Sequence, residues 1–181
     1  KKGLIWGNIE PEYIVTIGEL AKKIKDFSMY RQNRHIGDVG SGLSRALYST
    51  YLSHLPQDQF KYDLTTHEDE RGKFVEVIKT LDSGQVSYFT ANSGVTRGGH
   101  YHHTKTEKFL VVKGQALFRF HDIHSGEILE FKTSSNFSEI VDTIPGWAHS
   151  ITNVGKGELI VLLWANEVFD PVNPDTTIFR V

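Results

Sequence analysis

Three potential metal ligands, His100, His102 and Glu107, lie close together in the stretch from Gly94 to Gly114. His100 and His102 are two residues apart, so on a β-strand their side chains point to the same face. Glu107 follows a short polar break and opens an apolar run that ends in a Lys-Gly turn signal. Two strands joined by a turn can therefore bring both imidazoles and the carboxylate to a common point.

A fourth candidate ligand, His149, lies downstream in the run Ile144-Pro145-Gly146-Trp147-Ala148-His149, and Asn153 follows it. A borderline divalent cation accepts two or three imidazoles together with a carboxylate. The chain has no cysteine, so any metal must use nitrogen and oxygen ligands. The sequence thus predicts one divalent cation per chain, and Zn²⁺ is the expected ion.

Length and charge narrow the class of protein. The chain has 181 residues and a formal net charge of -2, which leaves room for one ordinary domain and an appendage. The near-neutral charge gives no reason to expect nucleic acid or a membrane surface as partner. No apolar run is long enough to span a bilayer, and the N-terminus does not read as a signal peptide, so we expect a cytoplasmic protein. The abrupt opening at Lys1-Lys2-Gly3-Leu4-Ile5 is typical of a point inside a longer chain.

The order of elements predicts a helical segment followed by a β-domain. Thr16 and Glu19 form a capping-box pair at the start of a helix, and a second helix is expected to end near Pro56. Residues 1–57 therefore form a small helical segment, and its apolar stripe is expected to pack against another part of the protein. Residues 58–181 alternate between apolar and polar residues in short stretches, which favours an antiparallel sandwich or barrel. The expected strands include 74–78, 85–90, 116–120, 128–132 and 159–164.

The two histidine-bearing stretches resemble the two motifs of the cupin superfamily. The first reads G-x5-H-x-H-x4-E-x6-G from Gly94 to Gly114, and the second reads P-G-x2-H-x3-N from Pro145 to Asn153. The resemblance implies a mainly β fold, a cupin-type double-stranded β-helix (jelly-roll barrel) with a metal inside, preceded here by a short N-terminal helical segment. The alternative is a set of surface histidines on an unrelated β-domain.

A second resemblance suggests a reaction. The patterns D-x-R-G-x-F-x-E at 69–76 and G-V-x-R-G-x-H-Y at 94–101 are similar to those of dTDP-4-keto-6-deoxyglucose 3,5-epimerases. That likeness implies His100 as the base and Arg97 as an assisting cation. It also implies that the substrate's nucleotide contacts three residues on the first pattern, Arg71, Phe74 and Glu76.

The chain departs from those epimerases at two places. Glu107 stands where they carry a lysine that holds the enolate oxygen, and 167–171 lacks their catalytic tyrosine. A metal at His102, Glu107 and His149 can replace the lysine as electrophile. His100 remains either a fourth ligand or the base, and His103 and Lys105 are candidates for a second acid or base.

A closer resemblance covers nearly the whole chain and is to a bifunctional capsular polysaccharide enzyme. It is carried by 47–53, by 102–112 and by 166–176. In that family a short-chain reductase domain precedes a zinc cupin that epimerises C3 of a UDP-2-acetamido-2,6-dideoxy-4-hexulose. The reductase then uses NADPH to make the talose precursor of N-acetyl-L-fucosamine. The resemblance implies that 1–57 is the tail of the reductase domain, without its dinucleotide loop, and that the chain acts on a UDP-4-keto-6-deoxy-hexosamine as a homodimer.

Three functions remain open from sequence. The first is the sugar-nucleotide 3-epimerase, which Arg71, Phe74 and Arg97 favour, because a diphosphate needs cations and a nucleobase needs a stacking surface. The second is a metal-dependent cupin oxygenase or isomerase, in which two histidines and a carboxylate hold Fe(II). The third is a non-catalytic sugar-binding cupin.

Overall fold

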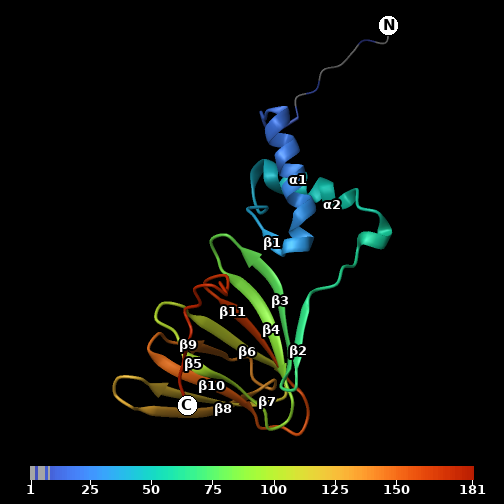
Figure 1. The fold of residues 1–181 in the computed structure, drawn as a ribbon. Coiled ribbons are helices and arrows are strands. Elements are labelled where there is room, and N and C mark those ends of the chain that lie inside the picture. Colours follow the sequence, from blue (N-terminus) through green and yellow to red (C-terminus); the bar gives the residue numbers. More distant parts are fainter. Residues whose placement is uncertain (1–2, 4–6, 8) are drawn as a thin grey trace. The chain divides into compact units, whose positions relative to one another are not determined.

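The computed structural model describes every residue except 1–2, 4–6 and 8 (Figure 1). Most of the opening Lys1–Ile5 stretch therefore lies outside the described residues. Contacts divide the chain into two units, one of Lys1–Asn33 with Asp38–Lys61 and one of Arg34–Gly37 with Tyr62–Val181. Within the described part of the chain, no helix is long and apolar enough to cross a membrane.

The first unit is helical. It contains α1 (Ile17–Asn33), α2 (Gly42–Ser53) and a short 3-10 turn, Gln57–Gln59. The predicted capping box is present: the Thr16 hydroxyl accepts the Glu19 N–H at 3.2 Å, and the Glu19 carboxylate accepts the Thr16 N–H at 3.0 Å. Phe27 is 3% exposed and packs against tyrosine rings, whereas Ile17 on the same helix is 87% exposed. The apolar stripe is thus only partly covered within this unit.

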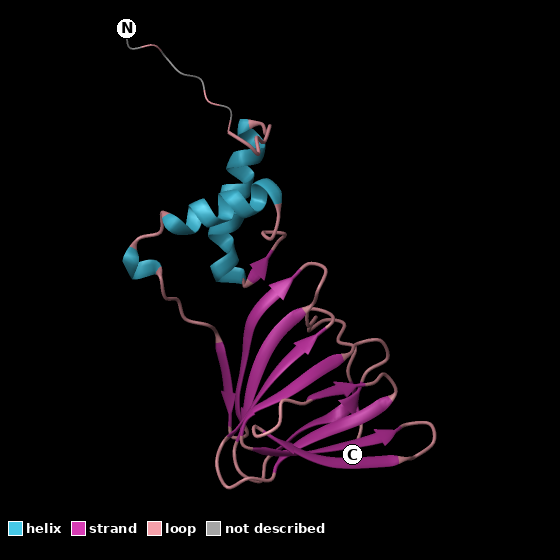
Figure 2. Ribbon diagram, turned by 180° about the vertical axis from the view of Figure 1, so that it is seen from behind, coloured by secondary structure: helices cyan, strands magenta, loops and turns pink. Residues whose placement is uncertain are grey.

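The second unit is built from strands, as Figure 2 shows. These are β1 (His35–Ile36), β2 (Thr66–Asp69), β3 (Gly72–Thr80), β4 (Gln85–Ala91), β5 (Thr96–Tyr101), β6 (Glu107–Lys113), β7 (Gln115–Asp122), β8 (Ile128–Ser134), β9 (Ile140–Thr143), β10 (Trp147–Asn153), β11 (Leu159–Ala165) and β12 (Thr177–Ile178).

The strands form two sheets whose order interleaves distant parts of the chain. One sheet has the order β1-β3-β4-β11-β6-β9, with β2 paired to β3, and the other has the order β12-β5-β10-β7-β8. Apart from the parallel β1–β3 pair, the pairings among the described strands are antiparallel. Strands that follow one another in the chain, such as β4 and β5 or β10 and β11, lie in different sheets, which is the jelly-roll pattern. The predicted cupin-type barrel with a short N-terminal helical segment is confirmed.

An aromatic core fills the space between the sheets. Along β6, β7 and β11 the buried residues alternate with more exposed ones, which follows from the two-residue period of a strand. The Phe109 ring lies 6.0 Å from the Phe118 ring on one side and 6.0 Å from the His149 imidazole on the other. The core therefore continues directly into the histidine cluster and supports it from within the barrel.

Candidate metal centre and substrate cavity

Three elements of the barrel carry the four candidate metal ligands. His100 lies on β5 and His102 just after it, Glu107 begins β6, and His149 lies on β10. The β5–β10 register places His149 beside His100. Gly98 makes this crossing possible: its φ is +90°, and a Cβ there would lie 2.7 Å from the carbonyl oxygen of His149.

The ligand atoms of His100, His102, Glu107 and His149 all lie within 4.8 Å of one another. The Glu107 Oε2 atom is 3.2 Å from the His102 Nε2 and 3.4 Å from the His149 Nε2. A tetrahedral ion with bonds of about 2.0–2.1 Å separates its ligand atoms by roughly 3.3–3.4 Å. The distances from Glu107 to His102 and to His149 therefore fit a small divalent cation.

The hydrogen bonding of His102 points to the same conclusion. Its Nδ1 donates to the backbone carbonyl of Asp175, which leaves Nε2 directed at the Glu107 carboxylate. In a neutral imidazole only one nitrogen carries a proton, so Nε2 then faces the carboxylate with a lone pair. That arrangement is repulsive unless a positive charge, either a proton on Nε2 or a metal ion, lies between the two atoms. His149 is 2% exposed, and among the described residues its Nδ1 has no hydrogen-bond partner.

Burial and neighbouring groups together set the charge states of His100 and Glu107. Burial, together with the neighbouring His149 and His102, lowers the pKa of His100 to about 4, so His100 is neutral near pH 7. Burial opposes ionisation of Glu107, but hydrogen bonds from His102 and His149 outweigh it and hold its pKa well below the usual range. The Lys105 ammonium lies 3.4 Å from the Glu107 Oε1 and adds to this effect. Neutral imidazoles and an ionised carboxylate are the forms that bind metals.

A cavity of about 270 Å³ opens beside this cluster. It is lined by Arg71, Phe74, Phe89, Arg97, Gly98, His100, Glu107, Phe109, His149, Ile151 and Leu163. Two guanidinium groups, an aromatic surface and a possible metal centre thus share one cavity.

The two arginines of this cavity are held differently. Arg97 donates from Nε to the backbone carbonyl of Thr90 at 2.9 Å and lies 5.4 Å from the Phe89 ring centroid. Burial lowers the pKa of Arg97, as does the charge of Arg71. Arg71 is more exposed and pairs with Asp69. Both cations keep N–H groups for an anionic ligand, Arg97 from a largely buried position and Arg71 from a more exposed one.

A model of the polysaccharide biosynthesis C-terminal domain family matches residues 67–177. The chain belongs to this family. The matched range runs from β2 to β12, so it includes every residue of the candidate metal centre and the lining of the cavity beside it.

Two family relatives are similar over nearly the whole chain. UDP-2-acetamido-2,6-beta-L-arabino-hexul-4-ose reductase of Pseudomonas aeruginosa is 58% identical over 93% of this chain and 45% of its own length. The capsular polysaccharide assembling protein CapF of Staphylococcus aureus superposes with a TM-score of 0.92, at 42% identity over 94% of this chain and 47% of its own. The resemblance to a capsular polysaccharide enzyme is confirmed, and this chain spans less than half the length of both relatives.

A more distant structural likeness concerns the fold alone. Oxalate decarboxylase of Lactobacillus farciminis superposes with a TM-score of 0.54, at 20% identity over 64% of this chain and 33% of its own. Identity this low says nothing about the reaction.

Three residues assigned from sequence lie apart from the cavity lining. The Glu76 carboxylate forms ion pairs at 2.9 Å with both Arg34 and Lys79. The side chain of His103 is 65% exposed and lies 3.3 Å from the Asp175 carboxylate. Lys105 is buried beside Glu107 without lining the cavity. Their proposed roles as nucleotide contact (Glu76) and second acid or base (His103, Lys105) remain predictions.

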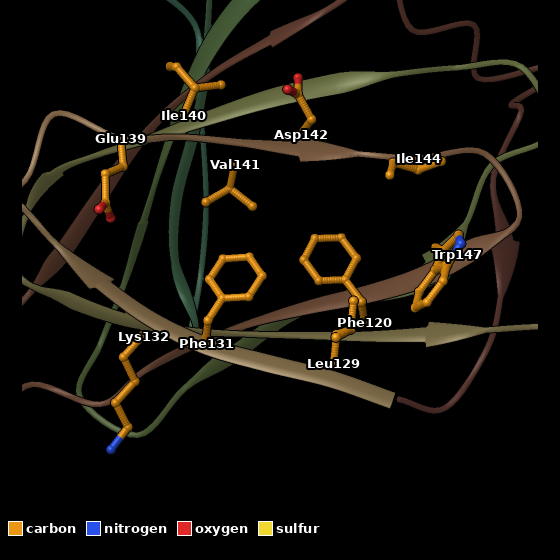
Figure 3. A pocket seen from close by; sticks show the side chains of 10 residues that line it. All are labelled: Phe120, Leu129, Phe131, Lys132, Glu139, Ile140, Val141, Asp142, Ile144 and Trp147. Carbon is orange, nitrogen blue, oxygen red and sulfur yellow. The ribbon is translucent and has the colours of Figure 1, made fainter. Parts of the chain in front are cut away.

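A larger, mainly apolar cavity of about 640 Å³ lies between β7, β8, β9 and the start of β10 (Figure 3). In the figure the side chains of Phe120, Phe131 and Val141 point into it, while the Lys132 amine points away. None of the four candidate ligands, and neither arginine of the smaller cavity, lines it. It offers apolar surface but little to bind a diphosphate.

Two contributors to the site were not identified from sequence. Asp175 contacts the loop after β5 from at least 70 residues away, and Phe109 forms the wall behind His149. Asp175 lies in a stretch that resembles the capsular enzyme, which was the one available signal. Nothing in its local pattern distinguishes it from other loop aspartates.

Proposed function

We propose that this chain epimerises C3 of a UDP-2-acetamido-2,6-dideoxy-4-hexulose, a step in making the capsular precursor N-acetyl-L-fucosamine. The observation that supports it most is the convergence of His100, the metal cluster, Arg71 and Arg97 on one cavity. A base, an electrophile and cations for a diphosphate are what proton exchange next to a ketone of a sugar nucleotide requires. The family and its relatives support a role in making capsular sugar nucleotides.

In this proposal His100 moves the proton. The C4 ketone acidifies the C3 hydrogen, and a neutral imidazole is needed to remove it. The low pKa of His100 keeps that imidazole neutral near pH 7. Removal leaves an enolate, and return of a proton to the opposite face inverts C3. His103 or Lys105 is the candidate for that second proton transfer.

His102, Glu107 and His149 would hold the divalent cation, with Zn²⁺ as the proposed ion. When bound, such a cation supplies positive charge to the developing enolate oxygen. The chain's own residues do the rest. Arg71 and Arg97 bind the diphosphate, and Phe74 offers a stacking surface to the nucleobase. The apolar wall formed by Phe109, Ile151 and Leu163 limits water near the reacting carbon.

The helical unit is proposed to be the tail of a reductase domain, with 1–57 belonging to it and 58–181 to the cupin. The partly uncovered stripe on α1 and the chain's 45% share of its Pseudomonas relative support this. NADPH would then serve the reductase portion alone. The homodimer and the cytoplasmic location stay predictions.

The test is incubation of this chain, loaded with Zn²⁺ and without NADPH, with a UDP-2-acetamido-2,6-dideoxy-4-hexulose. Proton NMR should show a second 4-keto sugar nucleotide, inverted at C3, and no reduced sugar. A substrate that stays unchanged under conditions where UDP binding is saturated would refute the epimerase function. Oxygen uptake by an iron-loaded sample would instead support the oxygenase alternative.

A further inference from the structure

The segment after β11 returns to β5, the strand that carries His100. β12 pairs antiparallel with β5, so that Ile178 lies opposite His100, and the Phe179 N–H donates to the Gly99 carbonyl at 2.9 Å. This return places Asp175 beside the loop that leaves β5. We call residues 170–178 the C-terminal strap.

The carboxylate of Asp175 collects the donors of that loop. Its Oδ1 accepts the N–H of His103 at 2.8 Å, and its Oδ2 accepts the N–H groups of Thr104 at 2.7 Å and Lys105 at 2.8 Å. The Thr104 hydroxyl donates to the same Oδ2 at 3.0 Å. Three successive backbone N–H groups directed at one anion form a nest, and charge-assisted bonds of this kind are roughly twice as strong as neutral ones.

The backbone of the same residue holds a metal ligand. The Asp175 carbonyl accepts from the Nδ1 of His102, which fixes both the tautomer and the rotation of the ring and leaves Nε2 toward Glu107. Lys105, whose N–H binds the Asp175 carboxylate, brings its ammonium to 3.4 Å from the other Glu107 oxygen. Asp175 thus orders the segment from His102 to Lys105, whose two ends contact the two carboxylate oxygens of Glu107.

We propose that Asp175 is a positioning residue for the metal centre: its carboxylate locks the 103–105 loop onto the strap, and its carbonyl then holds His102 in the metal-binding orientation. This inference rests on the metal site of the proposed function but not on the sugar reaction. The nest explains how a side-chain substitution can act on a backbone carbonyl. Without the carboxylate, the strap loses four hydrogen bonds to the loop, so the Asp175 carbonyl is no longer held against His102.

The experiment compares Zn²⁺ affinity, by competition with a chelator, in the wild-type chain and three variants. Asp175→Asn keeps the size of the side chain but loses its charge and points an amide donor at N–H groups. We expect Zn²⁺ binding to weaken about 10- to 100-fold, the usual cost of losing an outer-shell partner. Thr104→Val removes one of the four donors and should give a smaller loss. Asp170→Asn is the matched control. Asp170 lies on the same strap, and within the described part of the chain its carboxylate accepts a hydrogen bond only from the Val172 N–H, at 2.8 Å, so this variant should bind Zn²⁺ like the wild type.

A second measurement distinguishes the positioning of His102 from a purely structural role of Asp175. Long-range proton–nitrogen NMR of the Zn²⁺-loaded wild type should show a protonated Nδ1 on His102, and this signal should be lost or heterogeneous in Asp175→Asn. Wild-type affinity and an unchanged His102 signal in folded Asp175→Asn would overturn the positioning role, even if the variant unfolds more easily. Failure of the wild type to bind Zn²⁺ would instead refute the metal centre, and this inference with it.

Discussion

A pair of cavities in the barrel differ in size and in chemistry, and the smaller of these has the features of a reaction site. The cavity beside the histidine cluster has about 270 Å³ and contains two arginines, His100 and Glu107. The cavity between β8 and β9 has about 640 Å³ and is lined mainly by apolar side chains. Volume alone would favour the second. Convergent ionisable groups with perturbed pKa values favour the first, and these groups are what catalysis needs.

The largest effect should come from removing the anionic ligand. Glu107→Gln takes away the carboxylate that lies between His102 and His149, so we expect Zn²⁺ affinity to fall by at least about 100-fold, beyond the loss that outer partners cause. Equilibrium dialysis against a chelator measures this. Glu158→Gln is the control, because Glu158 pairs with Lys113 at the surface. If Glu107→Gln retains stoichiometric metal, Glu107 is not an essential ligand, and the chemical difference argued here between the two cavities is contradicted.

A pH experiment on the metal-free protein tests the burial of His100. Its pKa is about 4 in the folded state against an ordinary value of 6.5, so between these values the unfolded chain binds more protons. The free energy of unfolding should therefore fall as the pH drops from about 6.5 to about 4, by up to roughly 3 kcal/mol from this residue. Urea unfolding at pH 7 and pH 5 measures it. His100→Asn should show a shallower loss, and identical pH dependence in both proteins would contradict the burial argument.

Arg97 should affect binding of the nucleotide. Arg97→Ala removes a fixed guanidinium from the cavity, and a charged hydrogen bond contributes about 1.5–3 kcal/mol, so UDP affinity should fall about 10- to 100-fold. Calorimetry with UDP gives the value. Arg119→Ala is the control, since Arg119 pairs with Glu130 outside this cavity and should leave UDP binding unchanged. Equal losses in both variants would indicate a general charge effect.

The smallest effect is expected in the larger cavity. Leu129 lines it and is 47% exposed, so Leu129→Ala should change both stability and C3 exchange only slightly. Initial rates with the 4-keto substrate measure the second quantity. A Leu129→Ala variant that folds and binds Zn²⁺ normally but loses exchange would place the substrate in the larger cavity.

Local patterns in the sequence predicted much of the barrel and the ligand cluster. The Thr16–Glu19 capping box depends on residues three apart, and the pairing of His100 with His102 depends on residues two apart. The motif resemblance added the cupin fold and supported His149 as the fourth candidate ligand. These features were accessible because spacing along a single strand or helix turn determines which side chains meet.

The contacts that sequence did not predict join distant segments. Glu76 was assigned to the nucleotide, yet its carboxylate pairs with Arg34, more than 40 residues earlier. Asp175 has no local pattern that would identify it as the residue holding the His102 loop. Such pairings depend on strand order and on where the strap crosses the barrel, and one sequence does not specify either.

The central claim is that His100 and the metal centre act together on C3. It is tested most directly by deuterium wash-in at C3 of the 4-keto substrate, followed by mass spectrometry in heavy water. Zn²⁺-loaded wild type should incorporate deuterium, whereas metal-depleted wild type and metal-loaded His100→Asn should be slower by about 10²- to 10⁴-fold with UDP binding retained. If His100→Asn loses its metal as well, His100 is a ligand and His103 or Lys105 becomes the candidate base. Wash-in at the wild-type rate in folded, metal-free protein would contradict the account.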